Sequence, residues 1–167
     1  MRVKAFLFAL CSILLLGACG TPKTGGTVYN IMDYGAKGDG VTDDAAAIQT
    51  AIDQCSKSGG GTVLVPAGRT FMCSPFHLAS FVELHLEPNS CLLANPDEAA
   101  YTLSAFRDNR GEGMMWIYGQ DLKEVSITGT GTIDGNGVSF MGKELEDSYE
   151  LKPVTDFDPR PHVLTLI

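Results

Sequence analysis

Basic residues are scarce in this chain of 167 residues, which has 12 Lys and Arg against 20 Asp and Glu and a formal net charge of −8. A nucleic-acid-binding surface needs a basic face that displaces counterions, so this composition argues against DNA or RNA as a partner. An apolar run long enough to span a bilayer is also missing, because the longest, residues 5–16, is too short. The 19 glycines follow no triplet repeat, which excludes collagen and favours a turn-rich β architecture. A hydrophobic content of 44% is enough for one domain with a buried core.

The first 18 residues are predicted to be a processing signal and not part of the fold. Arg2 and Lys4 precede the apolar segment 5–16, as in a secretory signal peptide. The sequence Leu16-Gly17-Ala18-Cys19 then resembles the lipobox of bacterial lipoproteins, in which cleavage leaves the cysteine as a lipid-bearing first residue. An ordinary signal peptide, or an uncleaved N-terminal anchor, is the alternative.

These features divide the chain into a signal over residues 1–18, a flexible tether over 19–27 and a domain over 28–167. Several acyl chains give stable membrane attachment, and bacterial lipidation supplies them. We therefore expect an exported protein, anchored to the membrane by lipid at Cys19, at the bacterial cell surface or in the periplasm.

Three cysteines remain beyond Cys11 in the signal and the lipidation candidate Cys19: Cys55, Cys73 and Cys91. Their odd number and the absence of a Cys-x-x-Cys pair indicate neither a full disulfide framework nor a metal site. We expect small buried hydrophobic side chains, with one Cys73–Cys91 bridge as the alternative in an oxidising compartment.

One helix is predicted near the start of the domain, after a short strand over 28–31 and a loop over 33–40 whose glycines need positive φ. Thr42 is its expected cap, with Asp43 and Asp44 in the first turn. The buried face of the helix is expected to contain Ala45, Ile48, Ile52 and Cys55. The helix is expected to end at Gly59, Gly60 and Gly61.

Short β segments follow the helix. The segment 82–86 alternates and places Val82, Leu84 and Leu86 inward. Further strands are expected over 62–65, 91–93, 115–118, 125–127 and 131–133. This pattern favours a parallel β-helix with an N-terminal capping helix, from which residues 95–113 and 143–158 project as loops. A sandwich of antiparallel sheets is the competing fold.

Two blocks of residues carry a family resemblance. Residues 29–44, YNIMDYGAKGDGVTDD, and the segment 59–68 resemble the opening of the pectin-lyase-like right-handed β-helix superfamily. Residues 125–137, VSITGTGTIDGNG, followed by Arg160-Pro161, are similar to glycoside hydrolase family 28, the polygalacturonases. The resemblance implies an all-β, right-handed parallel β-helix and inverting hydrolysis of α-linked galacturonic acid in pectic polysaccharide.

The same resemblance implies a catalytic cluster of aspartates, a histidine and an Arg-x-Lys pair. One carboxyl would protonate the leaving oxygen while another activates water, about 6.5–9.5 Å away. The family motifs that carry these residues lie beyond Arg160-Pro161, and we therefore assign no catalytic or substrate-binding residue. The chain is expected to be an inactive N-terminal part of such an enzyme, incomplete at its C-terminus, with no cofactor and no metal.

Other polar residues have ordinary structural interpretations. Asp134 fits a turn, and neither a dinucleotide loop at Gly129-x-Gly131 nor a calcium loop at Asp134 and Asn136 is complete. Trp116 is expected in the core and His85 in solvent. His77 and His162 do not have the spacing of metal ligands. An acidic run is expected to lie in solvent and contains Glu144, Glu146, Asp147 and Glu150. Arg107 and Arg110 are candidates for contact with an anionic glycan.

Two functions of other kinds stay open from the sequence. A non-catalytic glycan-binding solenoid at the cell surface would keep the coil without the aspartates. A β-eliminating lyase of the pectate-lyase type would need calcium or a basic catalyst on the same fold.

Overall fold

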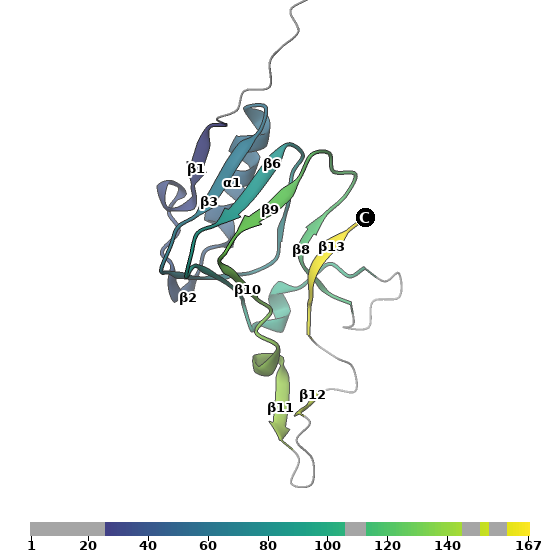
Figure 1. Ribbon diagram of the computed structural model, residues 1–167. Helices are drawn as coiled ribbons and strands as arrows, with labels where there is room; N and C mark the ends of the chain where they lie inside the picture. Colours follow the sequence, from purple (N-terminus) through teal and green to yellow (C-terminus); the bar gives the residue numbers. More distant parts are fainter. Residues whose placement is uncertain (1–25, 106–112, 145–150, 154–159) are drawn as a thin grey trace, which may run out of the picture.

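The computed structural model describes residues 26–105, 113–144, 151–153 and 160–167 (Figure 1). The predicted signal, the lipidation candidate Cys19 and nearly all of the tether lie outside these residues, as do Arg107, Arg110, Glu146, Asp147 and Glu150. Within the described part, no helix has the length and apolar character needed to cross a membrane.

Three sheets of parallel strands build the fold. The first sheet, in spatial order, contains β1 (Val28–Asn30), β3 (Gly61–Val65), β6 (Val82–Leu86) and β9 (Ser126–Gly129). The second contains β2 (Asp39–Asp43), β4 (Thr70–Cys73), β7 (Cys91–Ala94) and β10 (Thr132–Asp134). The third contains β5 (Phe76–His77), β8 (Met115–Gly119) and β13 (His162–Leu166).

The chain visits these sheets in turn and returns to the first, so it forms a right-handed parallel β-helix, as the sequence predicts (Figure 1). All strand pairs within the three sheets are parallel, which excludes a sandwich of antiparallel sheets. No helix interrupts the coil between residues 62 and 93.

Successive coils differ in length but keep their register. Thr62 on β3 lies beside Glu83 on β6, 21 residues later, whereas His85 on β6 lies beside Thr128 on β9, 43 residues later. The longer coil has an extra excursion between β7 and β8, where a loop is predicted; its described part includes the 3-10 helix η2 (Glu98–Ala100).

A second excursion leaves the stack after β10. It passes through the 3-10 helix η3 (Gly137–Phe140) into an antiparallel pair, β11 (Met141–Glu144) and β12 (Leu151–Pro153), which projects from the coils (Figure 1). The segment projects from the stack as predicted (Figure 1), but the expectation of a loop was wrong at 143–144 and 151–153, where backbone pairing between the two arms forms strands.

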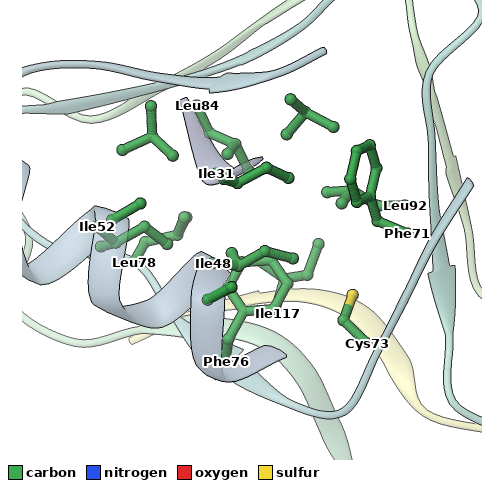
Figure 2. Packing of buried hydrophobic residues seen from close by; sticks show 14 of the residues in the cluster. Ile31, Ile48, Ile52, Phe71, Cys73, Phe76, Leu78, Leu84, Leu92 and Ile117 are labelled. Carbon is green, nitrogen blue, oxygen red and sulfur yellow. The ribbon is translucent and has the colours of Figure 1, made fainter. Parts of the chain in front are cut away.

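The core fills the space between the three sheets (Figure 2). Val82, Leu84 and Leu86 point inward from β6 and are at most 2% exposed, which confirms the predicted alternation. Trp116 is fully buried, as predicted, and its indole N–H donates to the carbonyl oxygen of Cys73 at 2.9 Å. That bond satisfies the one polar atom of the side chain, so the indole can lie in an apolar interior.

The predicted helix is α1 (Ala45–Lys57), the only α-helix in the described residues. Ile48, Ile52 and Cys55 are fully buried, and Ala45 is half-buried. The helix packs against the 3-10 helix η1 (Ile31–Tyr34), β3 and β5, and so covers the interior at the start of the stack. Gly59 and Gly60 have positive φ immediately after it, as expected for the glycines that end a helix.

The predicted start of the helix was wrong. Thr42 and Asp43 belong to β2, which pairs with β4, and this pairing continues through a hydrogen bond from Asp44 N–H to Met72 O at 2.8 Å. The Thr42 hydroxyl donates to Asp39 Oδ2. The carboxylate of Asp44 accepts from the N–H groups of Lys37 and Gly38 and makes no capping bond to α1. Pairing with β4 takes these residues out of the helix.

The alternative of a Cys73–Cys91 bridge was wrong as well. Cys73 pairs in register with Ala94, and Cys91 with Thr70, so the two cysteines are three residues out of register. At about 3.3 Å per residue their Cα atoms are too far apart for a disulfide. Cys55 and Cys73 are free and buried, as expected, but Cys91 is free and only half-buried, because it faces outward while Leu92 and Ala94 face inward.

Candidate functional site

Polar side chains gather on the outer face of the first sheet. Because Val82, Leu84 and Leu86 point into the coil, Glu83 and His85 of the same strand point outward. The parallel register places Thr62 of β3 beside Glu83 and Thr128 of β9 beside His85. We call Thr62, Glu83, His85 and Thr128 the Glu83–His85 cluster.

Hydrogen bonds connect the whole cluster. Thr62 Oγ1 donates to Glu83 Oε2 at 2.9 Å, and Thr128 Oγ1 donates to Glu83 Oε1 at 2.6 Å. His85 Nδ1 lies 2.7 Å from Thr128 Oγ1 and 3.8 Å from Glu83 Oε1. The side chains of Glu83 and His85 are each 37% exposed, so both are open to a ligand while their positions are fixed.

These bonds keep Glu83 charged. The hydroxyl of Thr128, followed by that of Thr62, lowers the pKa of Glu83, and His85 acts in the same direction; together they outweigh the effect of burial. Glu83 is therefore a carboxylate at neutral pH and can only accept hydrogen bonds. A general acid in glycoside hydrolysis needs the opposite, a raised pKa, so Glu83 is unsuited to that role.

A second polar group lies where the second sheet turns into the third. The carboxylate of Asp43 accepts from the Ser74 N–H and hydroxyl, and Asn95 Nδ2 donates to Ser74 Oγ. In the next coil, Asn136 Nδ2 donates to the carbonyl oxygen of Ala94 at 3.0 Å. The hydrogen bonds of this group fix the corners of successive coils, so we interpret it as structural.

An apolar hollow of about 560 Å³ opens at the last coil, lined by residues that include Leu122, Ile127, Leu164 and Leu166. Leu164 and Leu166 of β13 are 47% and 61% exposed. Glu124 is the only charged side chain in its lining. The hollow is thus an extension of the coil interior and offers no arrangement of reactive groups.

Residues with structural interpretations from sequence behave accordingly. Asp134 is exposed, and its Oδ1 accepts from the N–H of Asn136, which has a φ of 52°, so this is a turn. His77 is held beside α1 by Gln49 and lies 3.7 Å from Asp53. His162 is exposed on β13. No group of three or more potential metal ligands occurs among the described residues.

Sequence reasoning missed the Glu83–His85 cluster. The alternation of β6 indicates that His85 points outward, which the structure confirms, but it also led to the interpretation of a purely solvated side chain. Thr128, the partner of His85, lies 43 residues away, and only the register of β6 with β9 brings the two together.

Comparisons with known proteins agree with this architecture. A family model described as rhamnogalacturonase A/epimerase, pectate lyase-like, matches residues 28–138. A crystal structure of a hyperthermoactive exopolygalacturonase from Thermotoga maritima superposes with a TM-score of 0.57 and 35% identity, over 66% of this chain and 25% of that one.

Two curated relatives show the same partial overlap. A polygalacturonase from Chamaecyparis obtusa is 30% identical over 122 residues, which are 72% of this chain and 22% of that protein. Alginate lyase 7 from Azotobacter vinelandii is 65% identical over 40 residues, which are 24% of this chain and 5% of that protein. The chain therefore spans less than a quarter of the length of either relative.

Proposed function

This chain belongs to the rhamnogalacturonase A/epimerase, pectate lyase-like family, and from that premise we propose that it forms the opening coils of a glycoside hydrolase that acts on pectic polysaccharide. The observation that carries the proposal is the family match over residues 28–138, which coincides with a regular parallel coil. Similarity to a polygalacturonase from Chamaecyparis obtusa and to an exopolygalacturonase from Thermotoga maritima supports the hydrolase.

Inverting hydrolysis needs an acid and a base, two carboxyls about 6.5–9.5 Å apart. The first sheet carries Glu83 as its only acidic residue. Every described carboxyl with a displaced pKa has it lowered: hydrogen bonds from the backbone of Thr42 and Val41 lower that of Asp39 to about 2, and the pKa values of Asp43 and Glu83 are lowered too. We propose that this chain alone supplies scaffold and binding surface, and that the reacting carboxyls are not among its described residues.

The test is incubation of the 167-residue chain with polygalacturonate, with reducing ends and ultraviolet absorbance followed together. We expect neither signal to rise. New reducing ends without absorbance would contradict our placement of the catalytic carboxyls outside the described residues. A product with a double bond, which absorbs in the ultraviolet, would replace the hydrolase with a β-eliminating lyase, an alternative that the similarity to alginate lyase 7 keeps in view.

A non-catalytic glycan-binding solenoid is the second candidate. The observation in its favour is the Glu83–His85 cluster, which presents hydrogen-bonding groups on a strand face without a second carboxyl. Such a protein would bind a polysaccharide and leave it intact, so retention of the glycan with no product of either kind by a longer form of the protein would favour it.

We further propose export and lipid attachment at Cys19. The support is the sequence alone, in which a basic start, an apolar segment and Leu16-Gly17-Ala18-Cys19 follow one another. An enzyme held in this way would meet its polysaccharide outside the cytoplasm.

A further inference from the structure

The direction of the hydrogen bonds in the Glu83–His85 cluster fixes which ring nitrogen of His85 carries the hydrogen in a neutral imidazole. Ionised Glu83 can only accept, so the single hydroxyl hydrogen of Thr128 points to Glu83 Oε1. Thr128 Oγ1 then has only lone pairs to offer His85, and Nδ1 must carry the hydrogen of the 2.7 Å contact. In a neutral imidazole, Nε2 is consequently the bare nitrogen, a hydrogen-bond acceptor.

Nε2 of His85 is also unused. Among the described residues no group hydrogen-bonds to it, although the side chain is 37% exposed. His77 differs, because its Nε2 lies 3.1 Å from Gln49 Nε2 and is occupied within the fold. Glu83 has acceptor capacity left as well, since a carboxylate offers about four lone-pair sites and two are taken. The cluster thus presents two neighbouring acceptors, a pattern that suits a ligand with adjacent donors.

The charge around the cluster selects against an anionic ligand. None of β1, β3, β6 and β9 contains lysine or arginine, and Glu83 carries a fixed negative charge. Lys123, in the corner before β9, is followed directly by Glu124. A free uronate carboxylate placed here would face Glu83 without a basic side chain on the sheet, whereas a sugar hydroxyl would find acceptors.

We propose that the Glu83–His85 cluster is a subsite for an uncharged sugar unit of a pectic chain, either a neutral sugar or a methyl-esterified uronate, whose adjacent hydroxyls donate to His85 Nε2 and Glu83. The choice of a pectic chain as the ligand of this cluster rests on the proposed function. Thr128 acts as a positioning residue, because it sets the tautomer of His85 and touches no sugar itself.

The test is isothermal titration of the full chain with three oligosaccharides of equal length: a methyl-esterified oligogalacturonide, its de-esterified form and an uncharged galactan. Thr128→Val and Thr62→Val form a matched pair of variants. Each removes one hydroxyl bond to Glu83 from a half-buried position on a neighbouring strand, but only Thr128 contacts His85.

We expect the esterified ligand to bind more tightly than the de-esterified one. Thr128→Val should weaken that binding about fivefold to tenfold, the effect of one hydrogen bond, while Thr62→Val changes it much less. Nitrogen NMR of the His85 ring should show hydrogen on Nδ1 in the wild type and in Thr62→Val, and its loss from Nδ1 in Thr128→Val. A loss of stability common to both variants would not move the hydrogen of the His85 ring in only one of them.

The outcomes separate this subsite from the pectic function. Equal or tighter binding of the de-esterified ligand would overturn the subsite and leave the proposed function standing. Binding of the galactan, weakened by Thr128→Val, would support the subsite as one for a neutral sugar, whether or not the protein acts on uronate chains. Absence of binding to all three ligands, equal effects of the two variants, or hydrogen on Nε2 in the wild type would each overturn the proposal.

Discussion

Substitution of Gly129 by alanine tests whether the coils are stacked as closely as the structure shows. Gly129 ends β9 with a φ of 96°, and a Cβ added there would lie 1.9 Å from the carbonyl oxygen of Leu86 on the coil before. That oxygen already accepts from the N–H groups of Thr130 and Gly131. The methyl group therefore cannot enter without moving backbone that holds two coils together.

Gly35 provides the matched control. Its φ of 99° is nearly the same, but a Cβ there meets nothing within 4 Å. Gly35→Ala should lose only the cost of a left-handed alanine, about 1–2 kcal/mol. Gly129→Ala adds the strain of an overpacked contact, about 1–3 kcal/mol more, so the two variants should differ by about 2 kcal/mol in unfolding free energy.

The assay is urea unfolding followed by the fluorescence of Trp116, the only tryptophan in the chain and a fully buried one. Free energies from the midpoints and slopes of the two variants are compared with the wild type. If Gly129→Ala were no less stable than Gly35→Ala, the close approach of β9 to Leu86 would be refuted, and with it the stacking of the corner between the first and second sheets.

Two further predictions concern Asp43 and Cys19. Burial raises the pKa of Asp43, but hydrogen bonds from Ser74 and Ala45 outweigh this effect, so the pKa is lowered from 3.8. The ionised Asp43 therefore stabilises the fold fully at neutral pH, and this stabilisation is lost as the pH falls below 3.8. Asp43→Asn should thus lower the unfolding free energy at neutral pH and flatten its decline in acid, measured by urea unfolding along a pH series; an unchanged pH dependence would contradict this. Cys19→Ala should abolish the incorporation of labelled fatty acid into the protein in bacteria that express it, and a wild type that takes up no label would contradict lipid attachment.

The parts of the fold that the sequence predicts are those with a local pattern. β6 alternates over five residues, so Leu84 and its neighbours could be assigned to the core, and α1 repeats its apolar residues at helical spacing. β2 has no such pattern, because Asp39 to Asp43 pair with β4 through the backbone and present no apolar face. β5 has only two residues, Phe76 and His77, which is too short for any period.

The candidate site was harder to predict than the fold. Nothing in the local sequence of Glu83 or His85 distinguishes these residues from ordinary solvated positions. Their roles depend on two hydroxyls from other coils, and those are selected by register across two strand pairs. The error at Cys91 has the same origin, since only its pairing with Thr70 shows how far it lies from Cys73.

The unequal lengths of the two coils also bear on engineering. One coil contains 21 residues and the next contains 43, yet β6 stays in register with both β3 and β9. The register of neighbouring strands is therefore independent of the length of chain that connects them. A foreign segment, such as an affinity tag or a small reporter domain, could be inserted between β7 and β8 without changing the register of the sheets. Natural insertions between β7 and β8 would leave the coils unchanged for the same reason.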